Sequence, residues 1–232
     1  MKTRSPKRKH LMKIKAFLLT LVVIFSVFSA NSCKKEVKDR DYDEAQVLAA
    51  AKDLIQKSEK LNDIYYGYGI EADTGDTNNA NGYYYPADVL SLEKFGVQTV
   101  NDIKALTRAC FTTAQAEYMM NNTFASVKDT NGDIIHFARY YQEYDSLNLN
   151  ETKCIMVYTK YKPFLIDTVE YLYDTLKVSD VDGEIIIVEI EVIATNESGN
   201  AQRKNIKVNL LEEADGFRLD SPTYARNTVI QE

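Results

Sequence analysis

The chain has few of the residues on which most enzymes rely for their chemistry. Its 232 residues include two histidines, three cysteines and no tryptophan. It contains no G-x-S-x-G turn, no H-E-x-x-H pair, no phosphate-binding loop and no G-x-G-x-x-G sequence. No C-x-x-C pair or Cys/His spacing typical of a metal site is present. We therefore expect a protein that is not an enzyme and that uses neither a cofactor nor a metal.

His136 is the one histidine outside the N-terminal segment. It alternates with Ile134 and Ala138 on an expected strand, which is typical of a half-buried structural side chain. A thiol–imidazole nucleophile would need Cys110 or Cys154 beside it. Carboxylates are abundant, but no pair is singled out as the acid and base of a glycosidase. The absence of tryptophan also weakens the case for a sugar-stacking site.

One acidic loop resembles the beginning of a calcium-binding loop. Asp129, Asn131 and Asp133 have the required spacing, but the twelfth position is Tyr140 in place of the bidentate glutamate. A tight turn is therefore the interpretation that we favour. A second acidic loop, at 73–76, has a weaker resemblance to a metal site.

The first 32 residues have the three-part layout of a secretory signal peptide. The apolar run at 16–30 is shorter than the about 20 residues that span a bilayer, and small residues follow it. Met12 is a second candidate start for the chain. A basic region without acidic residues precedes the apolar run, with the cations Lys2, Arg4, Lys7, Arg8, Lys9, Lys13 and Lys15.

Cys33 stands directly after this segment, in a setting that resembles a lipobox. Ala30 and Asn31 depart from the usual lipobox, and Ala30-x-Ser32 also suits the ordinary signal peptidase, which would release the chain. We expect lipidation, because a lone cysteine at this junction is otherwise hard to explain. The protein would then be exported and anchored to the extracytoplasmic face of the membrane by acyl chains, with 33–42 as anchor and tether.

The part of the chain after the leader is acidic. Without the seven leader cations, 21 basic residues face 34 acidic ones, a net charge of about −13. Because nucleic-acid phosphates require Lys and Arg, we expect no nucleic-acid partner. The acidic surface could instead bind a basic protein partner, or it could simply be solvated. Export permits a disulfide between Cys110 and Cys154, but we favour free buried thiols.

Helix signals dominate the first half of the remaining chain. Asp41 and Glu44 mark a helix start, and the helix is expected to continue to about Tyr66. Thr99 with Asp102 predicts a helix through Arg108, and a Thr112 capping box predicts another that ends near 121–122. The first helix has a stripe of apolar or small residues at Val47, Ala51, Leu54, Ser58, Leu61 and Tyr65.

Strand signals dominate the second half. We expect strands at 134–141, 166–178, 184–194, 205–212 and 217–221, joined by Gly-containing and Asn-containing turns. Residues 43–232 are therefore predicted to form a single α+β domain, with N-terminal helices packed on a curved antiparallel β-sheet meander. One face of 184–194 is expected to be buried, with Ile186, Val188, Ile190, Val192 and Ala194.

Tyrosine is the residue that stands out, with sixteen in the chain. A polar loop at 71–82 lies between two groups of them, and we expect about half of the flanking side chains to cover the rim of the core. Tyrosine supplies rigid contact area with a polar tip, which favours a partner-binding surface beside the loop. The flanking residues are Tyr65, Tyr66, Tyr68, Tyr83, Tyr84 and Tyr85.

The order of these segments resembles one family, the IseA-type inhibitors of cell-wall DL-endopeptidases. The resemblance covers roughly residues 45–224. Two features depart from the family: the lipid anchor expected at Cys33, and Phe217 at a position often occupied by tryptophan. The resemblance is carried by 61–66 (LNDIYY), the tyrosine-rich stretch, 97–106 (VQTVNDIKAL), 110–112 (CFT) and 216–224 (GFRLDSPTY).

The resemblance implies a non-enzymatic protein that blocks the cleft of an NlpC/P60-type peptidoglycan hydrolase and restrains autolysis. An acidic domain suits such docking if the cleft is basic. The alternative is an NTF2-like or cystatin-like lipoprotein that binds a small ligand or an envelope peptide. A ligand binder predicts a cavity behind 184–194, whereas an inhibitor predicts a filled core and a protruding loop. A third possibility is an enzyme that uses Cys154 and His136.

Overall fold

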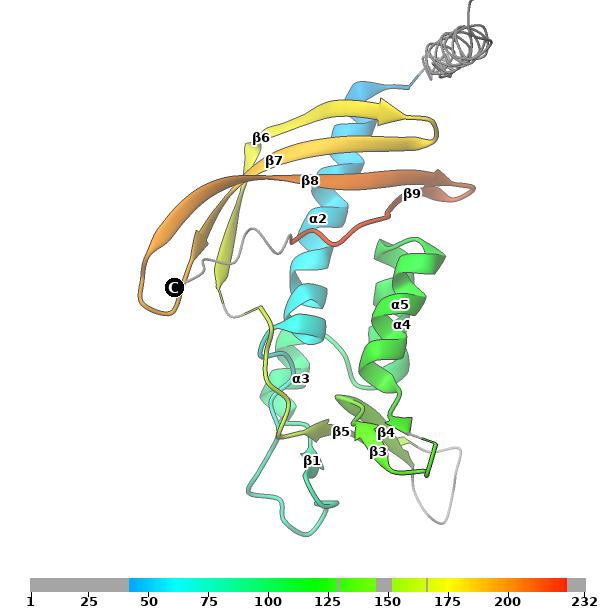
Figure 1. Cartoon of the computed structure of the whole chain (residues 1–232), viewed down its shortest axis with the longest axis vertical. Helices are drawn as coiled ribbons and strands as arrows, with labels where there is room; N and C mark the ends of the chain where they lie inside the picture. Colours follow the sequence, from blue (N-terminus) through cyan, green and yellow to red (C-terminus); the bar gives the residue numbers. More distant parts are fainter. Residues whose placement is uncertain (1–41, 129, 145–151, 166, 225–232) are drawn as a thin grey trace, which may run out of the picture. The chain divides into compact units, whose positions relative to one another are not determined.

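The structure is a computed structural model, and it describes residues 42–128, 130–144, 152–165 and 167–224 (Figure 1). All of these belong to one compact unit, Arg40–Glu232. The chain from residue 34 onward therefore retains every described element. The predicted signal peptide and Cys33, the predicted lipidation site, lie outside the described residues. Within the described residues, none of the helices has the length and apolar character needed to cross a membrane.

Helix α2 (Glu44–Tyr66) is the longest helix of the described chain. Its N-cap is Asp43, whose carboxylate accepts hydrogen bonds from the backbone N–H groups of Ala45 and Gln46 at 3.0 and 3.2 Å. The cap is therefore Asp43 and not the predicted Asp41, which lies outside the described residues. The predicted stripe is confirmed, because all six of its residues are buried: Val47, Ala51, Leu54, Ser58, Leu61 and Tyr65.

Three shorter helices follow α2. Helix α3 (Val89–Phe95) was not predicted. Helix α4 (Val100–Cys110) begins at the predicted Thr99–Asp102 capping box and continues two residues beyond the predicted end. Helix α5 (Thr113–Phe124) begins at the predicted Thr112, whose hydroxyl accepts from a first-turn N–H, and it also ends later than expected.

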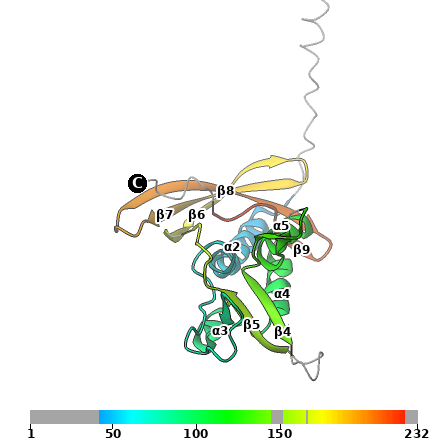
Figure 2. The ribbon, with the colours of Figure 1, turned by 60° about the horizontal axis from the view of Figure 1, so that its bottom comes forward.

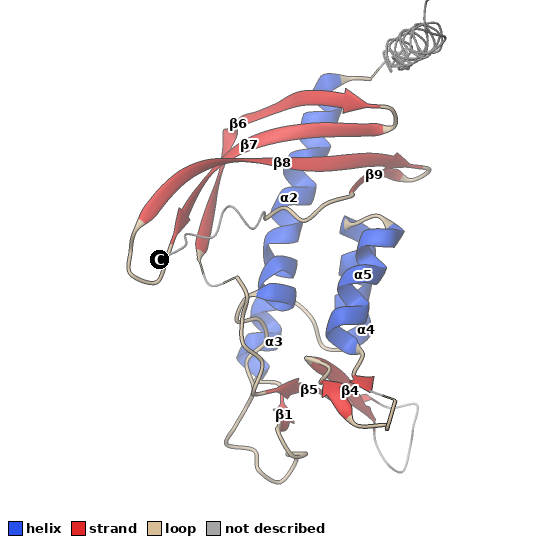
Figure 3. Cartoon of the chain, in the orientation of Figure 1, coloured by secondary structure: helices blue, strands red, loops and turns tan. Residues whose placement is uncertain are grey.

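The large sheet is an antiparallel meander of four strands in the order β6-β7-β8-β9. Figure 3 shows that its long strands are curved. The predicted turns are confirmed, including the turn at Gly183, which has a positive φ of 64°. The bounds are β6 (Thr168–Asp182), β7 (Ile185–Thr195), β8 (Ala201–Glu213) and β9 (Gly216–Leu219).

The inner face of β7 forms the centre of the core. Its five predicted core residues are each at most 1% exposed. Four of them, Ile186, Val188, Ile190 and Val192, belong to one hydrophobic cluster with the buried faces of α2 and α4. Helix α2 contacts both β6 and β9, so it crosses the inner face of the sheet. The predicted α+β class, with helices packed on a curved antiparallel sheet, is confirmed (Figures 1 and 2).

A second, small sheet has the order β1-β5-β4 and was not predicted as a separate unit. Its strands are β1 (Tyr84–Pro86), β5 (Thr152–Tyr158) and β4 (Tyr140–Tyr144). A separate two-stranded hairpin pairs β2 (Val127–Lys128) with β3 (Ile134–His136). In Figures 1 and 2 the helices α2 and α4 lie between the large sheet and the small sheet.

The predicted single strand at 134–141 is wrong, because the chain leaves the β2–β3 hairpin before it enters β4. The backbone N–H of Ala138 donates to the Ser126 hydroxyl at 2.9 Å, and that of Arg139 donates to the Thr123 carbonyl at 2.7 Å. These bonds tie the N–H groups of 138 and 139 to the end of α5, while the Arg139 carbonyl accepts the Tyr158 N–H of β5 at 2.9 Å. The break therefore depends on a contact with α5 that strand periodicity does not report.

Candidate functional site

The six loop-flanking tyrosines do not form one surface. Tyr65 is only 2% exposed, and its hydroxyl is hydrogen-bonded to the Thr107 hydroxyl at 2.7 Å, so it is a core residue. Tyr66 is half-buried, and its ring packs against that of Tyr224 with centroids 4.7 Å apart. Tyr68 is exposed, and its hydroxyl donates to the Glu197 carboxylate at 2.7 Å.

The other three tyrosines lie at the small sheet, where two of them join an aromatic cluster. The ring of Tyr84 lies 4.9 Å from that of Tyr141 and 5.2 Å from that of Tyr158. Phe137 stacks on Tyr158 at 5.0 Å, and the exposed Tyr83 meets the same ring edge-on at 6.4 Å. We define the aromatic cluster as Tyr83, Tyr84, Phe137, Tyr141 and Tyr158. Tyr85 is half-buried and, one residue along the strand from Tyr84, faces the other side of the sheet.

The β2–β3 hairpin, which leads into Phe137 of this cluster, carries exposed aliphatic side chains. Val127, Ile134 and Ile135 are 47%, 42% and 68% exposed. The hairpin runs directly into Phe137, which connects these residues to the aromatic cluster. We call the cluster together with Val127, Ile134 and Ile135 the small-sheet surface. Exposed apolar side chains are typical of interaction sites where they gather into a patch.

The polar loop at 71–82 is fixed against the small sheet. The Asp73 N–H donates to the Pro86 carbonyl at 2.8 Å, and the Asn81 side-chain amide donates to the Tyr141 hydroxyl at 3.3 Å. The Asp73 and Asp76 carboxylates accept backbone N–H groups within the loop at 3.0 and 3.2 Å. These bonds support turn formation as the role of the acidic residues. The hydrogen bonds from Asn79 also lower the pKa of the Asp76 carboxyl.

Arg139 is a central residue that the sequence interpretation missed. It is 3% exposed, and one guanidinium nitrogen donates to the carbonyls of Gly67 and Tyr68 at 2.8 and 2.7 Å, just beyond the C-terminus of α2. The guanidinium carbon lies 3.8 Å from the ring centroid of Tyr161 and 5.0 Å from that of Tyr140. The last turn of α2 has no basic residue of its own. Arg139 therefore supplies the cation that a helix C-terminus favours.

Gly69 is required by the same contact. Its φ is +64°, and a Cβ atom there would collide with the Tyr140 hydroxyl and the Arg139 guanidinium. The sequence does contain one signal for Arg139, because it is a lone charged residue between Phe137-Ala138 and Tyr140. Nothing in 137–140, however, identifies α2 as the partner of Arg139.

His136 and the thiols have separate partners in the structure. The prediction that His136 is half-buried is wrong: its side chain is exposed, and its Nε2 lies 3.2 Å from the Asn122 carbonyl oxygen. The Cys154 thiol lies 3.5 Å from the Glu143 carboxylate. Burial, together with this carboxylate, raises the pKa of Cys154 to about 11. Such a thiol remains protonated at neutral pH, the opposite of an activated nucleophile.

Cys110 is buried, and its thiol donates to the Leu54 carbonyl at 3.4 Å. Burial raises the pKa of the Cys110 thiol to about 12. Both Cys110 and Cys154 are free, as the sequence interpretation favoured, but the expected burial holds only for Cys110, since Cys154 is half-buried.

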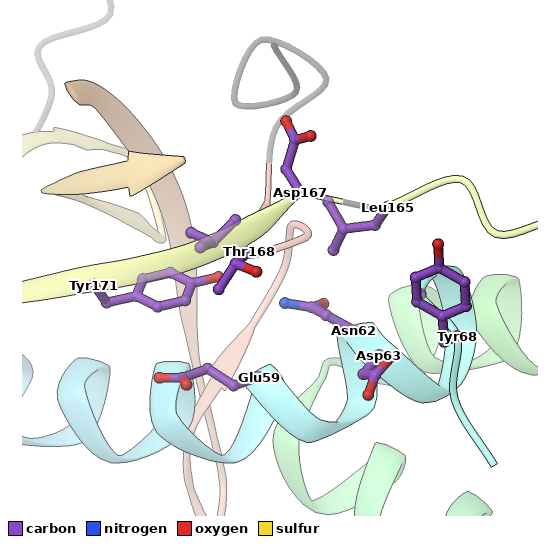
Figure 4. Close-up of a pocket in the computed structure, with 10 residues that line it drawn as sticks. Glu59, Asn62, Asp63, Tyr68, Leu165, Asp167, Thr168 and Tyr171 are labelled. Atoms are coloured by element: carbon purple, nitrogen blue, oxygen red, sulfur yellow. The ribbon is translucent and has the colours of Figure 1, made fainter. Parts of the chain in front are cut away.

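A polar groove lies between α2 and the beginning of β6 (Figure 4). It has a volume of about 340 Å³ and was not predicted. Glu59, Asn62 and Asp63 line it from α2, and Thr168 and Tyr171 line it from β6. The groove lies at the edge of the large sheet, whereas the inner face of β7 is packed with core side chains. The ligand-binding hypothesis predicted a cavity behind 184–194. At the inner face of β7 the structure instead has packed hydrophobic side chains.

The described residues contain no group of three or more His, Cys, Asp or Glu side chains placed to hold a metal ion. The chain matches no model of a known protein family, and no curated protein matches it significantly.

Proposed function

We propose that this chain is an exported, lipid-anchored, non-enzymatic protein that binds a peptidoglycan hydrolase of the NlpC/P60 type and restrains its activity. The small-sheet surface is the observation that carries this proposal. It exposes aliphatic and aromatic side chains in one region, supported by a sheet and a tethered loop. The resemblance of the sequence to IseA-type inhibitors supplies the class of partner.

The small-sheet surface suits a protein partner because its contact residues are positioned in advance. The Tyr84 hydroxyl donates to the Ala138 carbonyl at 2.6 Å, and the Thr159 hydroxyl donates to the Tyr83 carbonyl at 2.9 Å. Side chains that are already ordered lose less conformational entropy when they bind. Exposed Tyr83 and Ile135 would be the first residues to enter a hydrolase cleft.

The packing of the core supports the same proposal. The inner face of the large sheet is filled by α2 and α4 side chains, which suits a binding protein whose partner docks on the outside. The acidic character of the chain would favour a basic cleft and accelerate the encounter with it. An anchor at Cys33 would hold the inhibitor beside the membrane, where it would restrain hydrolases close to the membrane surface.

The experiment uses the chain from residue 34 onward, titrated into a peptidoglycan digest run by an NlpC/P60 endopeptidase of the same organism. We expect a stoichiometric loss of hydrolase activity. Ile135→Asp combined with Tyr83→Ala should weaken inhibition by about tenfold or more, because both remove exposed apolar contact area.

Leu106→Asp is the matched control, since Leu106 is 44% exposed on α4, outside the small-sheet surface. This control should inhibit as the unmodified chain does. Full hydrolase activity at a molar excess of the chain, for every NlpC/P60 enzyme of the organism, would contradict the proposal. An equal loss of inhibition in the control would show that the small-sheet surface is not the contact.

A lipoprotein that binds a small ligand is the second candidate function. The groove between α2 and β6 is the observation that favours it, since about 340 Å³ falls within the usual range of ligand pockets. The two functions use different surfaces, so each can be tested without the other.

A further inference from the structure

The groove between α2 and β6 is acidic. Three carboxylate residues line it, Glu59, Asp63 and Asp167, and its lining contains no Lys, Arg or His. Asp63 accepts the Gly69 N–H at 2.9 Å, and the exposed Lys94 ammonium lies 3.6 Å from its other oxygen. Acidic residues alone do not define a site, so the decisive feature is the amide of Asn62 at the centre of the groove.

A chain of hydrogen bonds fixes the orientation of this amide. The Ser58 hydroxyl donates its single proton to the Ile55 carbonyl at 2.7 Å. Ser58 must therefore accept the proton of the Thr223 hydroxyl, which lies 2.6 Å away. The Thr223 oxygen in turn accepts from the Asn62 amide nitrogen at 2.7 Å. The nitrogen thus faces Thr223, and the oxygen is the atom left over.

The Asn62 side-chain oxygen has no hydrogen-bond partner among the residues that the structure describes. The residue is 3% exposed, and it lines the groove. Figure 4 shows the amide between α2 and β6, with its nitrogen directed toward Tyr171. A buried acceptor without a donor costs about 1–3 kcal/mol. The site therefore lacks a hydrogen-bond donor.

We infer that the groove binds an organic ammonium ligand, whose N–H donates to the Asn62 oxygen while the surrounding carboxylates balance its charge. A cation that is also a donor satisfies both features of the site, whereas an anion would meet the carboxylate of Glu59 and that of Asp63. Tyr68 and Tyr171 add aromatic rings to the lining, together with Leu165 and Val169. Such rings favour cations and the methylene groups next to them. The volume suits a diamine or the side chain of a lysine-like residue.

The test is a titration of 1,5-diaminopentane into the isotope-labelled chain from residue 34, followed by NMR. We expect saturable shifts at the backbone amides of 59–69 and 167–171. 1,5-Pentanediol has the same length without charge and should produce no saturable shift. Affinity for the diamine should fall as salt is raised, because the carboxylates are partly exposed. Equal binding of the diol, or no saturable shift with the diamine, would overturn the inference.

Two variants locate the site. Glu59→Gln keeps the acceptor for the Tyr173 hydroxyl, which donates to Glu59 at 2.6 Å, and should weaken diamine binding about threefold to fivefold. Asn62→Leu should weaken it by about tenfold or more. Glu117→Gln removes the same charge from an exposed position on α5 and should leave binding unchanged.

Because Asn62→Leu also interrupts the hydrogen-bond chain, its folding is checked by thermal unfolding, and Glu59→Gln carries the test if the leucine variant is unstable. Equal effects of Glu59→Gln and Glu117→Gln would reject the groove as the binding site. Hydrolase inhibition by the groove variants should be unchanged, so the two proposals fail independently.

Discussion

The large sheet and the β2–β3 hairpin use similar residues for different purposes. On the inner face of the large sheet, the aliphatic side chains of β7 and β8 are at most 2% exposed and belong to the same core as the buried faces of α2 and α4. At the small-sheet end, aliphatic side chains of the same kind remain 42–68% exposed on the β2–β3 hairpin. Burial of apolar area is the main source of folding stability, whereas exposed apolar area is available to a partner. The comparison separates a region that stabilises the fold from a region suited to binding.

The largest difference between the two regions should appear in stability. Ile190 on β7 is 0% exposed, and Ile135 on β3 is 68% exposed. Ile190→Ala should lower the free energy of unfolding by about 2–5 kcal/mol, because it leaves a cavity in a packed core. Ile135→Ala should change it by no more than about 0.5 kcal/mol. Urea unfolding of the chain from residue 34 measures both, and similar costs for the two variants would erase the distinction.

The core of the large sheet was predictable because local pattern and tertiary burial agree there. Five alternating residues of β7 point to one side, and the Asp182–Gly183 turn fixes where that strand begins. The helical spacing from Val47 to Tyr65 likewise places one stripe of α2 against the sheet. Because this stripe includes Tyr65, the helical spacing predicts that Tyr65 is buried. The spacing says nothing about the burial of the other loop-flanking tyrosines.

The small-sheet region was less predictable because its structure depends on contacts between distant segments. Strand β5 pairs with β1 and β4, and the interruption before β4 depends on bonds to the end of α5. The groove required the proximity of Asn62 and Thr223, which are 161 residues apart. No local pattern of charge or hydrophobicity reports such a pairing.

Arg139 joins the start of β4 to the C-terminus of α2, and its replacement should have the next largest effect. Arg139→Met keeps much of the apolar stem but leaves the carbonyls of Gly67 and Tyr68 without their donor. We expect a loss of about 2–3 kcal/mol in the free energy of unfolding. Arg139→Lys should recover part of this, because an ammonium can bond a carbonyl but stacks less well on Tyr161.

Chemical denaturation compares these two variants of Arg139 with the unmodified chain. A methionine variant as stable as the original would show that the cation at the end of α2 contributes little. Hydrogen exchange should locate the loss at the last turn of α2 and at β4, because Arg139 joins these elements. A loss spread evenly over β6–β9 would contradict the role assigned to Arg139.

The smallest expected effect is a difference between the two thiols in how they change the free energy of unfolding at alkaline pH. Burial raises the pKa of Cys110 from its ordinary value of 9.0 to about 12. Above pH 9.0 the unfolded chain loses this proton while the folded chain keeps it, so the folded state binds more protons. The contribution of the protonated Cys110 thiol to the free energy of unfolding is therefore complete below pH 9 and is lost as the pH rises toward 12.

Cys154 should show the same sign with a smaller amplitude. Its pKa is also raised by burial, to about 11, but its side chain is partly exposed and solvent screens the effect. Cys110→Ala should reduce the loss of unfolding free energy between about pH 8 and pH 10 by about 1 kcal/mol, and Cys154→Ala by less than about half of that. Urea unfolding under reducing conditions at the two pH values measures the difference. Buried tyrosines contribute the same loss of unfolding free energy at alkaline pH to every variant, so differences between the variants report on the thiols. Equal effects of the two substitutions would show that Cys110 is no less accessible to solvent than Cys154.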